Sequence, residues 1–114
     1  MVQPTMYPNG RWIGIDLGTS NTCVSYWSIN HDGIGKAEVI QNQEGKYTTP
    51  SVVAFKDVET ELIGDAAVNH AVMKPQQFIY DAKRLIGKKK FADHPEIAEY
   101  IKNWPFKVME DASD

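Results

Sequence analysis

The sequence has a single cysteine, Cys23, among 114 residues. One cysteine excludes a disulfide framework and a cysteine-rich zinc site, and it is typical of a reducing compartment. No apolar run approaches the roughly 18 residues that a membrane-spanning helix requires. Residues 1–11 have neither the apolar core of a secretory signal nor an arginine-rich targeting pattern. We therefore expect a cytoplasmic protein without membrane association.

The sequence also has no excess of positive charge. Twelve Lys and Arg stand against 15 Asp and Glu, a net charge of -3, which excludes a generally basic nucleic-acid-binding protein. The basic residues Lys83, Arg84 and Lys88–Lys90 are better explained as the positive end of a helix than as a signal for nucleic-acid binding or nuclear import. His31, His70 and His94 lack metal-ligand spacing, so we expect them at the surface. The 42% of hydrophobic residues nevertheless suffices for a core.

The first half of the chain has the pattern of β-strands. After a loose arm at residues 1–11, the apolar residues of 13–17 alternate with Gly14 and Asp16. Residues 22–29 and 37–41 are again β-rich, and polar turns join the three segments. The sequence therefore predicts a three-stranded antiparallel meander at the start of a fold that occupies residues 12–114.

Helical signals follow the strands. Residues 47–55 are extended and residues 61–63 form a short apolar stretch. Asp65 is predicted to cap a helix that ends near Met73, and a second helix is predicted over 75–87. A third helix is predicted from about Pro95, and residues 104–108 look like the entry to a strand. Strands followed by helices indicate an α+β protein or the start of an α/β fold.

The segment Ile13–Cys23 contains the most informative motif. Gly18 allows a tight turn and a close approach of the backbone to a ligand, and the turn after it is rich in hydrogen-bond donors. A carboxylate beside a phosphate cradle needs a cation between them, so Asp16 implies Mg²⁺ held through water. The motif is neither a Walker loop nor a dinucleotide fingerprint. An ordinary hairpin with a polar turn remains the alternative reading from residue types alone.

This segment resembles the first phosphate-binding hairpin of the DnaK-type 70-kDa heat-shock chaperone family, which has an actin-like (ribonuclease H-like) ATPase fold. Four further stretches match in the same order, and together they cover most of residues 13–108. They are Val39–Phe55, Leu62–Ala67, Asp81–Gly87 and Trp104–Phe106.

The resemblance implies a role for each residue that matches the motif. Asp16 would face the magnesium through water, and Gly18, Thr19, Ser20 and Asn21 would cradle the β- and γ-phosphates of ATP or ADP. The resemblance also places Lys83 near the γ-phosphate, where it would orient the attacking water. Thr48 would lie close to the same centre, with Arg84 as a structural neighbour. From the residue alone, Lys83 would be a solvated helix lysine.

The resemblance further implies that residues 12–114 are the N-terminal part of lobe one of the ATPase domain, incomplete at its C-terminal end. The parent would hydrolyse ATP to drive cycles of unfolded-polypeptide binding and release, assisted by cochaperones. The isolated chain is expected to be inactive, and its exposed apolar surface favours self-association. The alternatives are another actin-like ATPase or sugar kinase, and a non-catalytic truncated interaction module.

Overall fold

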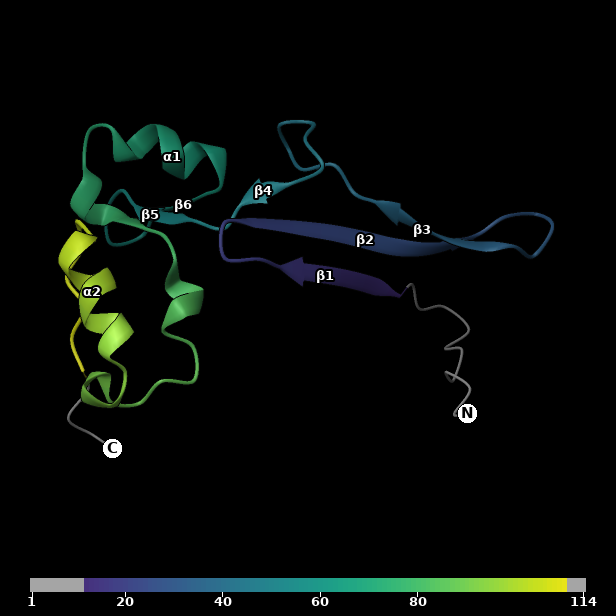
Figure 1. Cartoon of the computed structure of the whole chain (residues 1–114). Helices are drawn as coiled ribbons and strands as arrows, with labels where there is room; N and C mark the ends of the chain where they lie inside the picture. Colours follow the sequence, from purple (N-terminus) through teal and green to yellow (C-terminus); the bar gives the residue numbers. More distant parts are fainter. Residues whose placement is uncertain (1–11, 111–114) are drawn as a thin grey trace.

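The structure of the protein is a computed structural model that describes residues 12–110 (Figure 1). The predicted N-terminal arm, residues 1–11, lies outside the described residues. The chain is mixed α and β, and every strand pairing within residues 12–110 is antiparallel. No helix in this part of the chain is long and apolar enough to cross a membrane.

The first sheet follows the alternation of the sequence. Strands β1 (Ile13–Leu17), β2 (Asn21–Ile29) and β3 (Gly35–Val39) pair as neighbours in chain order, and β4 (Thr49–Pro50) pairs with the start of β2. β3 begins two residues earlier than the sequence predicts and ends at Val39 rather than Gln41. The long β2 extends away from the rest of the molecule and gives it an elongated form (Figure 1).

Short polar side chains organise the turns around these strands. The Oδ1 atom of Asn30 accepts the N–H groups of Asp32 and Ile34 in the β2–β3 turn. Asn42 plays the same role before β4, where its Oδ1 accepts the N–H groups of Glu44 and Lys46. Such local bonds satisfy the backbone where the chain leaves a strand, and they explain why these polar clusters form turns.

The second sheet is small and carries the first helix. Its order is β6 (Glu61–Ile63), β5 (Val53–Phe55) and β7 (Phe78–Ile79), with the helix α1 (Asp65–Ala71) packed against β5. Ala54 of β5 and Ala67 of α1 are fully buried. Small side chains at both positions let the helix approach the sheet closely.

The prediction for the start and end of this first helix is partly wrong. The N-cap is Gly64 at φ 62°, not Asp65, and the helix ends at Ala71 instead of Met73. Asp65 is the first helical residue, and its Oδ1 accepts a bond of 2.8 Å from the Lys46 ammonium. The Asp65 carboxylate therefore pairs with a lysine from another segment instead of capping the helix, and no side chain caps the N-terminus of α1.

The predicted helix over 75–87 is also wrong. The chain forms a 3₁₀ turn at Pro75–Gln77, the strand β7, and a second 3₁₀ turn at Ala82–Arg84. Asp81 between them has φ 57°, a left-handed conformation that interrupts any helix. Pairing of β7 with Val53 and Ala54 therefore overrides the helical period of the apolar residues.

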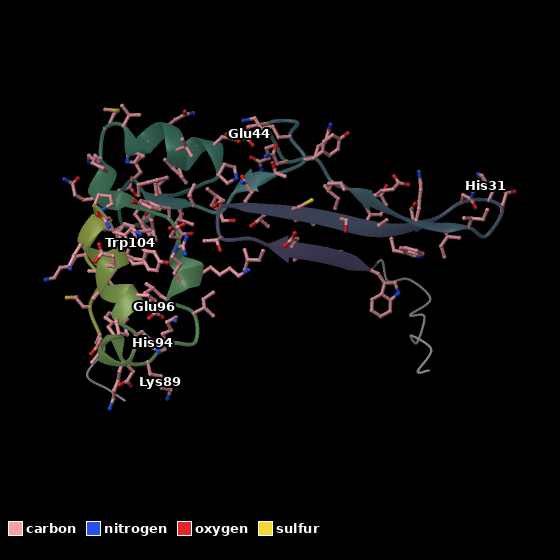
Figure 2. The ribbon with its side chains drawn as sticks, viewed as in Figure 1. His31, Glu44, Lys89, His94, Glu96 and Trp104 are labelled. Atoms are coloured by element: carbon pink, nitrogen blue, oxygen red, sulfur yellow. The ribbon has the colours of Figure 1, made fainter. Side chains whose placement is uncertain are left out.

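The predicted third helix is confirmed as α2 (Pro95–Asn103), but the strand predicted over 104–108 does not form in the described chain. Trp104 and Phe106 are instead buried with stacked rings 5.1 Å apart. Tyr100 of α2 stacks on Trp104, and Tyr80 meets Phe106 edge to face. This aromatic cluster is the core of the end of the molecule opposite the hairpin (Figure 2).

The described chain is extended for its length. The radius of gyration is 18.8 Å and the principal extents are 55 × 36 × 24 Å. A compact domain of this size has a radius of gyration of about 13 Å. The difference arises from the projecting first sheet, which has exposed apolar side chains on both faces. Ile13, Ile15 and Leu17 lie on one face, and Trp12, Trp27 and Ile29 lie on the other.

Candidate functional site

The turn between β1 and β2 is tight and leaves two backbone donors open. The Gly18 N–H donates to the carbonyl oxygen of Asn21 at 3.0 Å, and a Cβ at Gly18 would stand only 2.3 Å from that oxygen. The next two N–H groups, those of Thr19 and Ser20, donate to nothing within residues 12–110. Consecutive open N–H groups in a turn form a concavity that binds anions.

The segment that contains β4 docks directly on this turn. The Ser51 N–H donates to the carbonyl of Ser20 at 2.9 Å, and the hydroxyls of Thr22 and Ser51 lie 2.8 Å apart. Thr49 is the strand partner of Thr22. Three hydroxyl side chains are therefore held beside the turn by backbone pairing, not by flexible loops.

A lysine from far along the chain reaches the same place. The Lys83 ammonium donates to the carbonyl oxygen of Leu17 at 2.6 Å, across 66 residues of sequence. The 3₁₀ turn that carries Lys83 is held by Arg84, whose Nε donates to Asp81 at 2.9 Å. Arg84 also donates to the Tyr100 hydroxyl and stacks on that ring, so the aromatic core positions the lysine.

These segments surround one pocket of about 470 Å³. Its walls combine apolar side chains with hydroxyl groups and one cation. The residues that line it are Leu17, Gly18, Thr19, Thr22, Val24, Thr49, Pro50, Ser51, Val52, Val53, Ile63, Ala82, Lys83 and Ile86. Hydroxyls, open N–H groups and an ammonium are the donors that bind phosphate groups in proteins.

The structure brings some of the predicted site residues together and separates others. Gly18, Thr19 and Lys83 line the pocket, whereas Ser20 and Asn21 contribute their carbonyl groups to the turn and to the docking of β4. Thr48 lies outside the lining, and its carbonyl accepts a bond from Asn42. The adjacent Thr49 is the threonine that faces the pocket.

Asp16 lies on the other face of the sheet from the pocket. Strand alternation places its side chain on the side opposite Leu17, next to its strand partner Cys23. The carboxylate is exposed and has no hydrogen bond or ion pair with residues 12–110. No group of three potential metal ligands occurs in the described range. A single open carboxylate fits a cation that keeps its water shell, as Mg²⁺ does, but not a cage of protein ligands.

Sequence reasoning counts Thr22 among the hydrogen-bond donors of the turn, but it does not identify Thr49 and Ser51 as site residues. The signal for the last two was the Thr-Thr-Pro-Ser stretch, in which hydroxyl side chains flank a proline that favours extended backbone. The strand pairing of Thr22 with Thr49 could not be read from the sequence, because 27 residues separate them.

Other charged groups form their own local contacts away from the pocket. The pKa of Glu96 is lowered by its hydrogen bond of 2.7 Å from Lys88, and His94 lies 3.4 Å from the same carboxylate. His94 and the far-off His31 lie at opposite ends of the molecule (Figure 2). The sequence predicts all three histidines at the surface; His31 is exposed, whereas His70 and His94 are half-buried.

The site therefore combines a hairpin turn, a hydroxyl-bearing strand and a lysine from a 3₁₀ turn, a set of donors typical of proteins that bind anionic groups. Comparison with known proteins gives the family. The Hsp70 protein family model matches residues 12–114. The chain belongs to the Hsp70 family.

Individual relatives agree with this assignment. The chain is 49% identical over 102 residues to heat shock cognate 70 kDa protein 3 of Dictyostelium discoideum. The aligned residues make up 90% of this chain and 15% of that protein. It is 50% identical over 100 residues to heat shock 70 kDa protein 2 of Paracoccidioides lutzii, 88% of this chain and 14% of the relative. It is 44% identical over 102 residues to putative heat shock 70 kDa protein 7 of Homo sapiens, 90% of this chain and 26% of the relative. The chain thus spans about one seventh of the length of the first two relatives.

Proposed function

We propose that this chain supplies the first phosphate-binding hairpin of a chaperone ATPase in lobe one of an actin-like domain. One observation carries the proposal: the Lys83 ammonium is held at the end of β1, next to the open N–H groups of Thr19 and Ser20. Family membership supports the same assignment. The whole protein would use ATP hydrolysis to bind and release unfolded polypeptides in the cytoplasm with the help of cochaperones.

Both faces of the first sheet support a layered domain. A sheet with exposed Ile15 on one face and Trp27 on the other is typical of a central sheet covered by helices on both sides. An actin-like lobe provides such layers. We propose that the remaining parts of the domain in the longer protein cover these faces.

Different residues of the chain would bind the phosphates, hold Mg²⁺ and position the attacking water. The turn at Thr19 and Ser20 would donate to phosphate oxygens beyond the end of the sheet, and Asp16, on the face opposite the pocket, would hold Mg²⁺ there through water. When bound, the cation would neutralise phosphate charge. Lys83 would place its ammonium near the water that attacks the terminal phosphate. Phosphoryl transfer depends mainly on such positioning and charge stabilisation.

The proposal is tested in a chimera in which residues 12–110 replace the matching segment of a full-length Hsp70 relative. We expect ATP hydrolysis by the chimera, and a loss on the order of 10²-fold in kcat for Lys83→Ala with only a small change in nucleotide affinity. Lys102→Ala is the matched control, since Lys102 is exposed on α2 and its one ion pair within the described chain is with Glu99. A Lys83→Ala chimera that hydrolyses ATP within a few-fold of the parent chimera would contradict the assignment.

The isolated 114-residue chain is expected to show no steady-state hydrolysis, because half of a phosphate site does not position both nucleotide and water. The alternative function, a non-catalytic interaction module, predicts that the chimera hydrolyses nothing although it folds. Hydrolysis by the chimera therefore separates the two functions.

A further inference from the structure

The 3₁₀ turn that carries Lys83 is held to the aromatic cluster on both sides. Tyr80 comes shortly before the turn, and its ring meets Phe106 edge to face with the ring centroids 5.6 Å apart. Arg84 is the last residue of the turn, and the central carbon of its guanidinium lies 4.5 Å from the centroid of the Tyr100 ring. Because the chain is fixed on both sides of the turn, the backbone of the lysine between them is held in place.

The two anchors belong to one stack of rings. Tyr100 of α2 stacks on Trp104 with the centroids 6.1 Å apart, and Trp104 stacks on Phe106 at 5.1 Å. Trp104 and Phe106 are buried. The Arg84 guanidinium packs on the Tyr100 ring and donates to its hydroxyl at 3.2 Å, so cation–π attraction adds to a hydrogen bond. The stack therefore gives the turn a packed frame that α2 helps to build.

Arg84 also fixes the backbone conformation of the turn. Its Nε donates to the Asp81 carboxylate at 2.9 Å, and its backbone N–H donates to the Asp81 carbonyl, also at 2.9 Å. Asp81 has φ 57°, and such a left-handed conformation persists in a residue with a side chain only where surrounding contacts determine it. The planar fork of a guanidinium can bond to a carboxylate and stack on a ring at once, which a lysine ammonium cannot do in the same geometry.

Lys83 depends on this frame for the position of its ammonium. Its side chain is exposed, and its one hydrogen bond within residues 12–110 is the bond to the Leu17 carbonyl. A lysine stem is flexible, so the ammonium is placed only as accurately as the backbone that carries it. A misplacement of about 1 Å can lower a reaction rate by about 10²-fold.

We propose that Arg84 is a positioning residue for the Lys83 ammonium, and that Tyr100 holds Arg84 in the required place. The inference rests on the proposed function, because Arg84 affects hydrolysis only through Lys83. Arg84 is not among the residues that line the pocket. Loss of its contacts should therefore lower kcat and leave nucleotide affinity nearly unchanged.

A double-mutant cycle tests this dependence in the chimera of residues 12–110 with a full-length Hsp70 relative. Arg84→Lys keeps the charge and removes the fork, so we expect kcat to fall on the order of tenfold with KM within about threefold of the parent. In a Lys83→Ala background the same substitution should change kcat by less than about twofold, because the group that Arg84 positions is gone. An equal loss in both backgrounds would give Arg84 a merely structural role and overturn the proposal.

Tyr100→Phe provides a second measurement with a smaller change to the fold. It removes the hydroxyl that bonds to Arg84 and keeps the ring that stacks on Trp104. Tyr26→Phe is the matched control, since the Tyr26 hydroxyl makes a part-buried hydrogen bond to Glu38 in the first sheet. We expect both variants to lower the melting temperature by only a few degrees and Tyr100→Phe alone to lower kcat, by roughly threefold or more. Equal kcat values for the two variants would overturn the proposal.

The same chimeras separate failure of this inference from failure of the proposed function. Hydrolysis that is lost with Lys83→Ala but unchanged with Arg84→Lys would overturn the positioning role alone. Hydrolysis that is equal with and without the Lys83 side chain would overturn the proposed function, and the positioning role with it.

Discussion

Two carboxylates on the first sheet differ in their surroundings at the scale of single residues. Glu38 of β3 accepts hydrogen bonds from Ser28 at 2.6 Å and Tyr26 at 2.9 Å, and Lys36 lies 3.3 Å away. These donors lower the pKa of Glu38, with Ser28 the largest cause. Asp16 has no such partners in the described chain, although it lies on the same sheet. The first carboxylate is tied to the fold, while the second is free for a ligand.

The lowered pKa of Glu38 predicts a loss of stability in acid. Its folded pKa lies below the ordinary value of 4.5, so the unfolded chain binds the proton more readily. The stability from this site is fully present above about pH 4.5 and disappears as pH falls through the folded pKa. We expect Glu38→Gln to flatten the acid side of a melting-temperature profile. Glu61→Gln is the control, since the Glu61 side chain has no hydrogen bond or ion pair within residues 12–110; an equal flattening by both variants would contradict the role of Glu38.

For Asp16, in contrast, we expect a substitution to affect function and not folding. Because its carboxylate is exposed and unpaired in the described chain, Asp16→Asn should leave the melting temperature of the 114-residue chain within about 3 °C of the parent. In the full-length chimera the same change should raise the Mg²⁺ concentration needed for hydrolysis. Thermal melts and a magnesium titration measure the two effects. A large drop in melting temperature with an unchanged magnesium response would give Asp16 a structural role instead.

At the scale of secondary-structure elements, the pocket depends on the docking of β4 against the start of β2. The hydroxyl pair of Thr22 and Ser51 joins the two segments, and both side chains are half-buried. The Ser51 N–H adds a backbone bond to Ser20. Loss of this junction would separate the threonine-bearing strand from the hairpin turn.

We expect Ser51→Ala to lower the free energy of unfolding by about 0.5–1.5 kcal/mol, because it removes one member of a part-buried hydrogen bond. Thr22→Val should have a similar effect. The double variant should be less destabilised than the sum of the two, since each change removes the same bond. Urea unfolding of all four proteins measures the coupling. Strict additivity would show that the two hydroxyls do not act as a pair.

At the scale of the whole molecule, stability should be distributed unevenly. Ala54, Ala67 and Ile97 are fully buried and belong to the end with the helices, while the far part of the β2–β3 hairpin projects from it (Figure 1). Segments with few buried contacts open more readily than the core. The molecule therefore combines a packed end with a sheet that lacks cover on both faces in the described chain.

Native-state hydrogen exchange measures this gradient. We expect the amide of Ala54 to exchange much more slowly than those of Ser28 and Lys36 near the hairpin turn. Uniform protection across both ends would contradict the predicted gradient.

The sequence by itself determined the features that depend on neighbouring residues. The alternation around Asp16 specified β1, and Pro95 with the apolar positions after it specified α2. The collinear motifs also identified the Hsp70 family, which the comparisons confirm. These features could be predicted from the sequence, because short stretches of chain determine the strand period, the start of a helix and the order of the motifs.

Only the tertiary structure decided the features that depend on distant partners. Phe78 and Ile79 belong to an apolar pattern with helical spacing over residues 75–87. They nevertheless form β7, because β5 offers backbone bonds and a buried surface. From its residue type alone, Lys83 is expected to be solvated, yet its ammonium bonds to the Leu17 carbonyl. Asp81 and Arg84 turn the chain at this point, and the aromatic core holds Arg84 in place. The free energy for both arrangements comes from contacts between segments far apart in the sequence, which no local pattern specifies.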